Sequence, residues 1–214
     1  MSLAEEQTKD SYWTLAGPAE GIFSEKRSKF LAFAYPVTTE EEALAYVSEV
    51  RAKYYDARHV CWAYRLGIDG ATTRSNDDGE PSGTAGKPIL GQLLSANVTE
   101  VVAVVIRYFG GVKLGTSGLI EAYREATREA LSTAKKVERI VERVFTVAFG
   151  YELMGEIMRL VKDWDARVLE QEFLESCRLS LSLRADEAPK LFGRLEQIYG
   201  TTLAWSDEEH NVEE

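Results

Sequence analysis

The stretch VVAVVIRYFGGVKLGTSG, from Val101 to Gly118, decides how this chain folds. Six apolar residues, rich in β-branched side chains, end at Arg107, and two aromatics and the pair Gly110-Gly111 follow. An apolar run of this length, closed by glycines, is typical of a buried central strand. Paired glycines let the backbone turn sharply, and a helical pattern starts just beyond them. We therefore expect a buried strand that delivers a cation, an aromatic pair and a glycine loop to one place on the surface.

The composition of the 214 residues is that of a globular protein, with 45% hydrophobic and 28% charged residues. No apolar segment approaches the roughly 20 residues that span a bilayer, and the first ten residues lack the apolar core of a signal peptide. Cys61 and Cys177 are too few for a disulfide framework, and with only His59 and His210 a zinc site is not expected. These features predict a cytoplasmic protein with no membrane partner.

The charge is distributed unevenly along the chain. The net charge is −10, of which residues 1–136 carry −2 and residues 137–214 carry −8. The acidic half is a poor candidate for binding nucleic acid, whereas the first half can carry a local basic patch. This asymmetry predicts two domains, at 1–136 and 137–206, followed by a frayed acidic tail at 207–214.

The pattern of apolar residues divides in the same way. In the first half we expect a charged hairpin within 11–36, a helix from Thr38 or Thr39 to about Tyr54, a strand at 59–66, a long turn-rich loop at 75–88 and a helix up to Asn97. The hairpin turn carries Lys26, Arg27 and Lys29, either as a solvated turn or as a basic edge that faces a ligand. From Val137 the order is βαββαβ, ending in a strand at 201–205, which is the order of a ferredoxin-like unit.

Two glycine-rich segments each precede a helix and each place a lysine at its start. They are SNDDGEPSGTAGKP, with Lys87, and RYFGGVKLG, with Lys113. Backbone N–H groups, a helix N-terminus and a lysine together suit an anion. Neither segment matches the P-loop spacing, and G-x-G-x-x-G is absent, so no nucleotide cofactor is predicted. Plain helix-capping loops are the alternative.

Three carboxylates, Asp77, Asp78 and Glu80, cluster around Gly79. They can hold a divalent cation or serve acid–base chemistry, although the EF-hand spacing is not met. They can equally lie in a solvated turn or pair with Arg58, Arg65 or Arg107. His59 can be a general base or a structural residue. Tyr108 and Phe109 can stack on a nucleic-acid base or pack under the glycine loop. No Ser or Cys lies in a nucleophile elbow.

Arg107 ends the buried strand, so its guanidinium must find a partner close by. It can form a bidentate ion pair with Asp77 or Asp78, which makes it a clamp between the two glycine-rich segments. It can also bind a phosphate through two hydrogen bonds, which makes it a ligand contact. Both alternatives place the two segments side by side.

The chain resembles the YigZ/IMPACT family. The match lies in ARH at Ala57–His59, NDDGEP at Asn76–Pro81, GTAGKP at Gly83–Pro88 and VVIRYFGGVKLG at Val104–Gly115, and it covers about residues 15–135. Ser117 departs from it, because a glycine is common there. The resemblance implies a first domain of the ribosomal-protein and elongation-factor type of βαβ fold, shared with GHMP kinases, and a ferredoxin-like second domain similar to the last domain of elongation factor G. It also implies an α+β protein that acts near translation by binding RNA, the ribosome or a translation-regulating protein.

These observations favour a non-enzymatic binding protein with an anion- or RNA-binding cleft in the first domain and no cofactor. The candidate donors are Arg58, His59, Lys87, Arg107 and Lys113. The full set of candidate ligand-binding residues is Arg58, His59, Asp77, Asp78, Gly79, Glu80, Thr84, Gly86, Lys87, Arg107, Tyr108, Gly110, Gly111 and Lys113. One alternative is a Mg²⁺-dependent hydrolase or phosphotransferase that uses Asp77, Asp78 or Glu80. The other is a protein-interaction module that docks through its acidic second domain.

Overall fold

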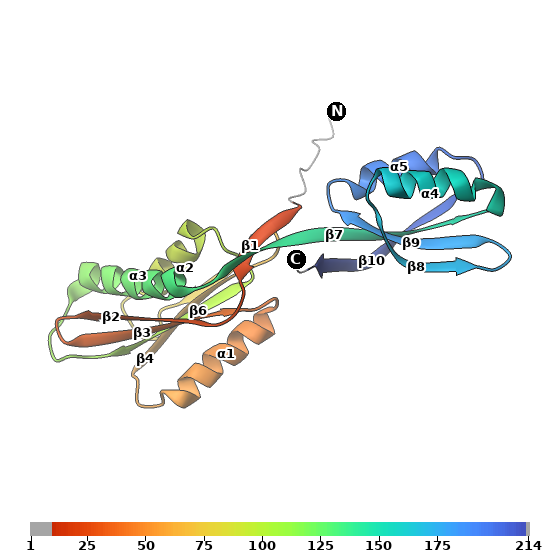
Figure 1. Ribbon diagram of the computed structural model, residues 1–214. Helices are drawn as coiled ribbons and strands as arrows, with labels where there is room; N and C mark the ends of the chain where they lie inside the picture. Colours follow the sequence, from red (N-terminus) through yellow and green to blue (C-terminus); the bar gives the residue numbers. More distant parts are fainter. Residues whose placement is uncertain (1–9, 213–214) are drawn as a thin grey trace. The chain divides into compact units, whose positions relative to one another are not determined.

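The computed structural model describes residues 10–212, which form two compact α+β units (Figure 1). The N-terminal unit contains Tyr12–Glu138. The C-terminal unit contains the described residues from Arg139 onward, together with Asp10 and Ser11. Within the described residues, no helix is both long enough and apolar enough to cross a membrane.

The N-terminal unit is built around an antiparallel sheet of five strands in the order β2-β3-β6-β4-β5. Its strands are β2 (Ala19–Glu25), β3 (Ser28–Pro36), β4 (His59–Leu66), β5 (Thr72–Asn76) and β6 (Val101–Tyr108). Its helices are α1 (Glu40–Lys53), α2 (Gly86–Ser95) and α3 (Gly115–Thr133). A further strand, β1 (Ser11–Leu15), pairs with β7 (Lys136–Phe149).

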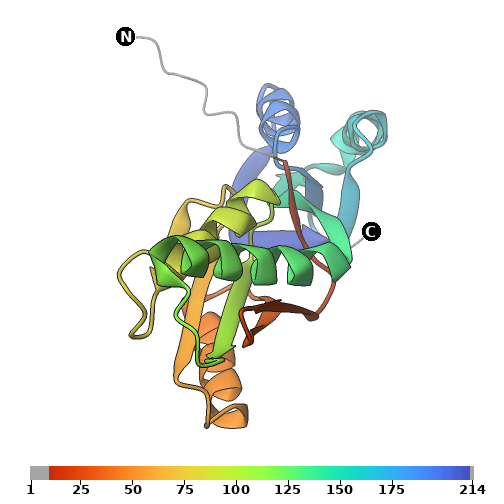
Figure 2. The same ribbon diagram turned by 90° about the vertical axis from the view of Figure 1, so that its left-hand side faces the viewer.

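Strand β6 lies at the centre of this sheet and is buried on both faces, as the sequence predicts. Val101, Ala103 and Val105 pack into one core with residues of α2 and α3. The alternate residues of β6 face a second core, which α1 covers. Figure 2 shows this layering, with α1 on one side of the sheet and α2 and α3 on the other. By the same alternation, Arg107 belongs to the α2–α3 face.

Helix α1 begins where the sequence predicts, at a capping box. Thr39 Oγ1 accepts the N–H of Glu42 at 3.1 Å, and the Glu42 carboxylate accepts the N–H of Thr38 at 2.8 Å. The hydrogen bond from Thr38 lowers the pKa of Glu42. These two hydrogen bonds, one to the N-cap Thr39 and one from the preceding Thr38, fix the turn after β3, from which α1 crosses over the sheet to β4.

The predicted long loop is shorter in the structure than in the sequence analysis. Strand β5 runs to Asn76 and α2 begins at Gly86, so only residues 77–85, here called the acidic loop, lack regular structure. Residues 109–114, between β6 and α3, are called the glycine loop. The predicted charged hairpin is confirmed, because Glu25 pairs with Ser28 and leaves a two-residue turn of Lys26 and Arg27.

The C-terminal unit follows the predicted order of elements. After β7 come a 3₁₀ turn, η1 (Tyr151–Leu153), then α4 (Met154–Asp163), β8 (Arg167–Phe173), β9 (Cys177–Arg184), α5 (Ala188–Glu196) and β10 (Thr202–Val212). The strands lie antiparallel in the order β10-β7-β9-β8. The prediction of a frayed tail at 207–214 was wrong for residues 207–212, because they belong to β10, whose backbone pairs with β7 as far as Val212. Glu213 and Glu214 lie outside the described residues.

Candidate functional site

The candidate residues gather where β6 ends and its two antiparallel neighbours, β3 and β4, begin. Arg107 of β6 lies opposite His59 of β4 on one side and Phe30 of β3 on the other. Arg107 is therefore held between two paired strands at the end of the sheet from which the glycine loop leaves. The acidic loop reaches the same place through Glu80.

Arg107 forms a buried ion pair with Glu80. Its Nη1 lies 2.8 Å from Glu80 Oε1, and the two side chains are only 9% and 4% exposed. The Tyr123 hydroxyl of α3 donates to the same Glu80 oxygen at 2.8 Å. The guanidinium also lies over the rings of Phe30 and Phe109, at 5.7 and 5.5 Å from their centroids. Arg107 is thus a clamp between the two loops, but its partner is Glu80 and not the predicted Asp77 or Asp78.

Cys61 extends this buried network beneath the acidic loop. Its Sγ lies 3.0 Å from the carbonyl oxygen of Asp77 and 3.3 Å from the Tyr123 hydroxyl. Burial raises the pKa of the Cys61 thiol and that of the Tyr123 hydroxyl, so both groups stay protonated. A protonated, buried thiol is a poor nucleophile, and Cys61 therefore acts as a structural residue.

Asp77 caps helix α2. Its Oδ1 accepts the N–H groups of Ala85 and Gly86 at 3.0 and 2.8 Å, and its Oδ2 accepts that of Gly83 at 2.7 Å. Burial on its own raises the pKa of Asp77, but these hydrogen bonds and the charge of Lys87 outweigh it, and the net pKa is lowered. The place that an anion would take at the start of α2 is therefore already filled by the protein's own carboxylate.

The helix start at Gly86 is also closely packed. A Cβ atom at Gly86 would lie 2.8 Å from the backbone nitrogen of Asn76. Glycine is needed here because α2 begins directly against the end of β5. Thr84, just before it, is buried and donates its hydroxyl to the Pro81 carbonyl at 2.7 Å.

Asp78 ties the acidic loop to α1 and β4. Its Oδ1 lies 2.8 Å from Nη2 of Arg51, and its Oδ2 accepts the N–H of Val60 at 2.7 Å. His59 Nδ1 lies 2.8 Å from the Asp78 carbonyl oxygen, which holds the imidazole against the loop. Asp78 itself has a φ of +42° and Gly79 has a φ of +84°, so the loop turns sharply here.

The three carboxylates of the acidic loop therefore diverge. Asp77 faces the start of α2, Asp78 faces Arg51, and Glu80 faces Arg107. Among the side chains that the structure describes, those of residues 10–206, no three or more His, Cys, Asp and Glu form a group that could hold a metal ion. The arrangement does not match the two or three convergent carboxylates that Mg²⁺-dependent catalysis needs.

The remaining candidates face outward. Arg58, Lys87 and Lys113 are exposed. Tyr108 is half-buried and donates its hydroxyl to Asp56 at 2.8 Å. Phe109 is 59% exposed, although packing under the glycine loop was one of its predicted alternatives.

The two helix starts differ from each other. The Asp77 carboxylate accepts backbone N–H groups at the start of α2. By contrast, no side chain within the described residues caps the start of α3 at Gly115. The backbone turns there through positive φ values, +86° at Gly111 and +73° at Gly115. The site thus combines a tightly bonded acidic loop with an open, cationic glycine loop.

The similarity of the chain to known proteins agrees with its motifs. The family model of the Impact N-terminal domain matches residues 26–131. The IMPACT family member YigZ of Escherichia coli (strain K12) is 33% identical over 188 residues, which are 87% of this chain and 92% of YigZ. The chain belongs to the YigZ/IMPACT family.

Two solved structures are also similar to this chain. A crystal structure of a hypothetical protein is 32% identical, with a TM-score of 0.67 over 94% of this chain and all of that one. The structure of Yih1, described as a two-domain translational regulator, is 28% identical, with a TM-score of 0.35 over 63% of this chain and 54% of that one.

Sequence reasoning missed three residues of the site in this IMPACT protein: Arg51, Cys61 and Tyr123. Tyr123 lies in the apolar stripe of α3, and a buried tyrosine hydroxyl needs a hydrogen-bond partner, which is a signal that could have been used. Arg51 is one of several charged residues on α1, and nothing in its spacing distinguishes it. Cys61 was expected only as a buried thiol.

Replacing Asp77 with asparagine is expected to lower the free energy of unfolding at neutral pH by about 1–2 kcal/mol. The carboxylate has a lowered pKa in the folded state, so its contribution is present above the unfolded-state value of about 4 and disappears as the pH falls through the folded-state pKa. Asp77→Asn should therefore flatten the acid limb of the stability curve. Urea unfolding at several pH values measures this, and an unchanged acid limb would contradict the capping role.

Proposed function

We propose that this IMPACT family member is a non-enzymatic, cytoplasmic RNA-binding protein linked to the regulation of translation. The link to translation rests on membership of the family, and Yih1 carries that description for itself. The RNA-binding surface is the end of the N-terminal unit where the two loops meet. RNA, alone or within the ribosome, is the partner whose backbone charge suits this surface.

The observation that carries this proposal is the separation of charge at the site. The carboxylates Asp77, Asp78 and Glu80 are engaged with internal partners, as described above. Arg58 and Lys113 are exposed, and neither forms an ion pair with the side chains described for residues 10–206. Lys113 of the glycine loop and Arg58, just before β4, are therefore cations that no carboxylate pairs with in the described structure, although the whole chain has a net charge of −10. A local cationic surface on an acidic protein favours a phosphate backbone as its ligand.

The same geometry disfavours the enzymatic alternative. A hydrolase that used Asp78 would have to break its bonds to Arg51 and Val60 before the carboxylate could bind a metal ion or move a proton. Glu80 would likewise have to leave Arg107 and Tyr123. Breaking a buried ion pair of this kind costs about 3–5 kcal/mol, which is a large penalty for a ground-state rearrangement.

We also infer the finer fold assignments that the family resemblance implies. The βαββαβ order of the C-terminal unit and its sheet order, β10-β7-β9-β8, support a ferredoxin-like domain. In the N-terminal unit, α1 links β3 to β4 across β6, which lies between them. This βαβ crossover supports the elongation-factor and GHMP type of fold.

A salt titration of RNA binding tests the proposed function. The full chain should bind a labelled RNA with an affinity that falls as the salt concentration rises, because each neutralised phosphate releases counterions. Arg58→Ala and Lys113→Ala should each weaken binding and lower the slope of log K against log salt by about 0.7 for a single strand. Lys135→Ala, which removes an exposed lysine away from the loops, is the matched control and should change little.

The opposite result has a clear meaning. Binding that is absent or independent of salt would overturn the RNA proposal and favour docking to a protein. The C-terminal unit offers a surface for that case, a groove of about 690 Å³ between α4 and α5. Charged residues of both signs line it, among them Glu156, Arg159, Asp163 and Arg194.

A further inference from the structure

The turn between β2 and β3 has an unusual choice of residues. Lys26 and Arg27 have φ values of +46° and +67°, so both lie in the left-handed region. A two-residue hairpin turn with this conformation favours Asn-Gly, because side chains with a Cβ atom are strained there. Two long cationic residues are therefore an unfavourable choice for the turn itself.

Nothing in the described structure compensates for this strain. Both side chains are exposed, and among residues 10–206, whose side chains the structure describes, neither Lys26 nor Arg27 forms a side-chain hydrogen bond, an ion pair or a ring contact. The nearest acidic residue in the sequence, Glu25, ends β2, and it too forms no ion pair with them. The hairpin needs the left-handed conformation at both positions, but it does not need long cationic residues there, and this choice points to a function for the two side chains.

The glycine loop packs directly on this turn. The N–H of Gly110 donates to Ser28 Oγ at 3.1 Å. A Cβ atom at Gly110 would lie 2.0 Å from the carbonyl carbon of Arg27, so only glycine allows the contact. The turn and the link between β6 and α3 lie at the same end of the N-terminal unit (Figure 1). Gly110 therefore lies against Arg27, with Phe109 directly before it and Lys113 three residues further along the same loop.

Phe109 supplies an aromatic surface among these cations. Its ring is 59% exposed and lies against the guanidinium of Arg107, 5.5 Å from the centroid. Arg107 is fixed in turn by its buried ion pair with Glu80. The ring is therefore presented to solvent from a rigid support, although an exposed phenylalanine contributes nothing to the core.

We propose that this tip, formed by Lys26, Arg27, Phe109 and Lys113, binds single-stranded RNA. Phe109 stacks on one unpaired base, and the three cations contact the neighbouring phosphates. A protruding ring can stack only on a base that is free of a duplex, so the tip selects single strands over double-stranded RNA. The inference rests on the proposed RNA-binding function and assigns it to one place.

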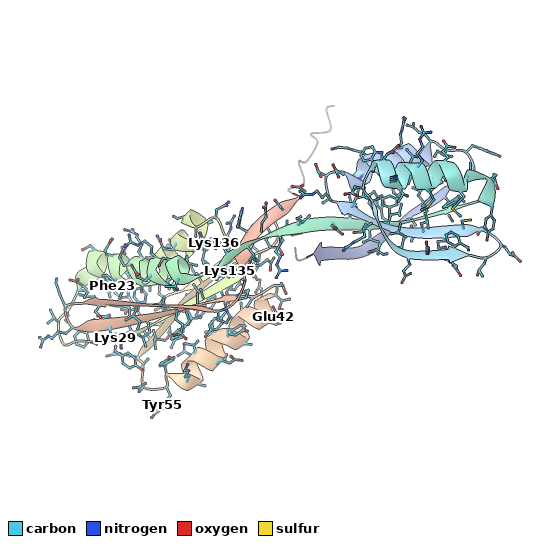
Figure 3. All side chains as sticks on the ribbon, in the orientation of Figure 1. Phe23, Lys29, Glu42, Tyr55, Lys135 and Lys136 are labelled. Carbon is cyan, nitrogen blue, oxygen red and sulfur yellow. The ribbon has the colours of Figure 1, made fainter. Side chains whose placement is uncertain are left out.

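Two variants separate this proposal from a general loss of stability. Lys26→Asn with Arg27→Gly creates the favoured turn sequence, so it should stabilise the hairpin while it removes two cations. Phe109→Leu keeps an apolar side chain and removes the aromatic ring. The control, Lys135→Ala with Lys136→Ala, removes the same charge at the other end of the unit, away from Lys29 and the tip (Figure 3).

Binding is measured by fluorescence anisotropy of a labelled oligouridylate with the full chain. An RNA of about a dozen nucleotides suits a site of this size. The turn variant should weaken binding, lower the salt slope by about 1.4 and raise the melting temperature. Phe109→Leu should weaken binding roughly 5- to 100-fold. The control should bind like the parent chain apart from a small uniform loss.

Three results would overturn the proposal. If the chain binds RNA but neither variant differs from the control, the tip is not the site, and the proposed function stands without it. If duplex RNA competes as well as the single strand, the stacking role of Phe109 is wrong. If the parent chain binds no RNA, the proposed function fails and this inference fails with it.

Discussion

Replacing Glu80 with alanine is expected to lower the free energy of unfolding of the N-terminal unit by about 3–5 kcal/mol. The change removes the carboxylate that Arg107 and Tyr123 share, and it leaves a guanidinium that is 91% buried without a counter-charge. The Nε of Arg107 already lacks a hydrogen-bond partner among the described residues, so no second acceptor is at hand. Burial of an unpaired charge is among the largest penalties that a single substitution can introduce.

Tryptophan fluorescence can measure this change in the N-terminal unit alone. Of the four tryptophans, Trp13 and Trp62 belong to that unit and Trp164 and Trp205 to the other. Urea unfolding of Glu80→Ala in a Trp164→Phe, Trp205→Phe background therefore reports on the unfolding of the N-terminal unit.

Two further variants give the result its meaning. Arg107→Met added to Glu80→Ala should recover part of the loss, because it removes the unpaired charge. Glu121→Ala breaks an exposed ion pair with Arg124 at a similar distance, 2.7 Å, and should change the stability by less than about 1 kcal/mol. If Glu80→Ala destabilised the unit no more than Glu121→Ala, Arg107 would not be a structural clamp.

Gly110→Ala is expected to destabilise the N-terminal unit by about 1–3 kcal/mol and to separate the glycine loop from the hairpin turn. The added methyl group would meet the backbone of Arg27 and Ser28, at 2.0–2.3 Å, and backbone atoms cannot rotate away. The hydrogen bond to Ser28 would be lost with the contact. Amide hydrogen exchange should become faster at residues 26–28 and 109–114 together.

Gly91 of α2 is the matched control for this change. A Cβ atom there would meet nothing within 4 Å, and alanine is a better helix former than glycine. Gly91→Ala should therefore stabilise the unit by up to about 1 kcal/mol. Equal effects of the two substitutions would mean that the loop does not depend on its contact with the turn.

Local sequence signals predicted the elements of this fold well. The apolar run at Val101–Ile106 is the central buried strand, because side chains on both of its faces enter a core. The cap at Thr39 depends on neighbouring residues alone, so the sequence contains all the information that it needs. The hairpin was predicted from the strand patterns on either side of a charged segment, although Lys26 and Arg27 are not the residues that its turn favours. Such features follow from periodicity and turn chemistry.

The partners within the site could not be predicted in the same way. The sequence brings Arg107 near the acidic loop, but which of three adjacent carboxylates it meets depends on where the loop turns. The positive φ values of Asp78 and Gly79 direct Glu80 toward Arg107, whereas Asp77 accepts hydrogen bonds at the start of α2. Contacts between residues distant in the chain, such as Asp78 with Arg51, leave no local pattern.

Hydrogen exchange of the full chain, with and without single-stranded RNA, tests the central claim most directly. If the tip is the binding surface, RNA should slow exchange in residues 24–29 and 108–115 and leave α4 and α5 of the C-terminal unit unchanged. Protection that is confined to the C-terminal unit, or that is absent at an RNA concentration where anisotropy shows binding, would contradict the account.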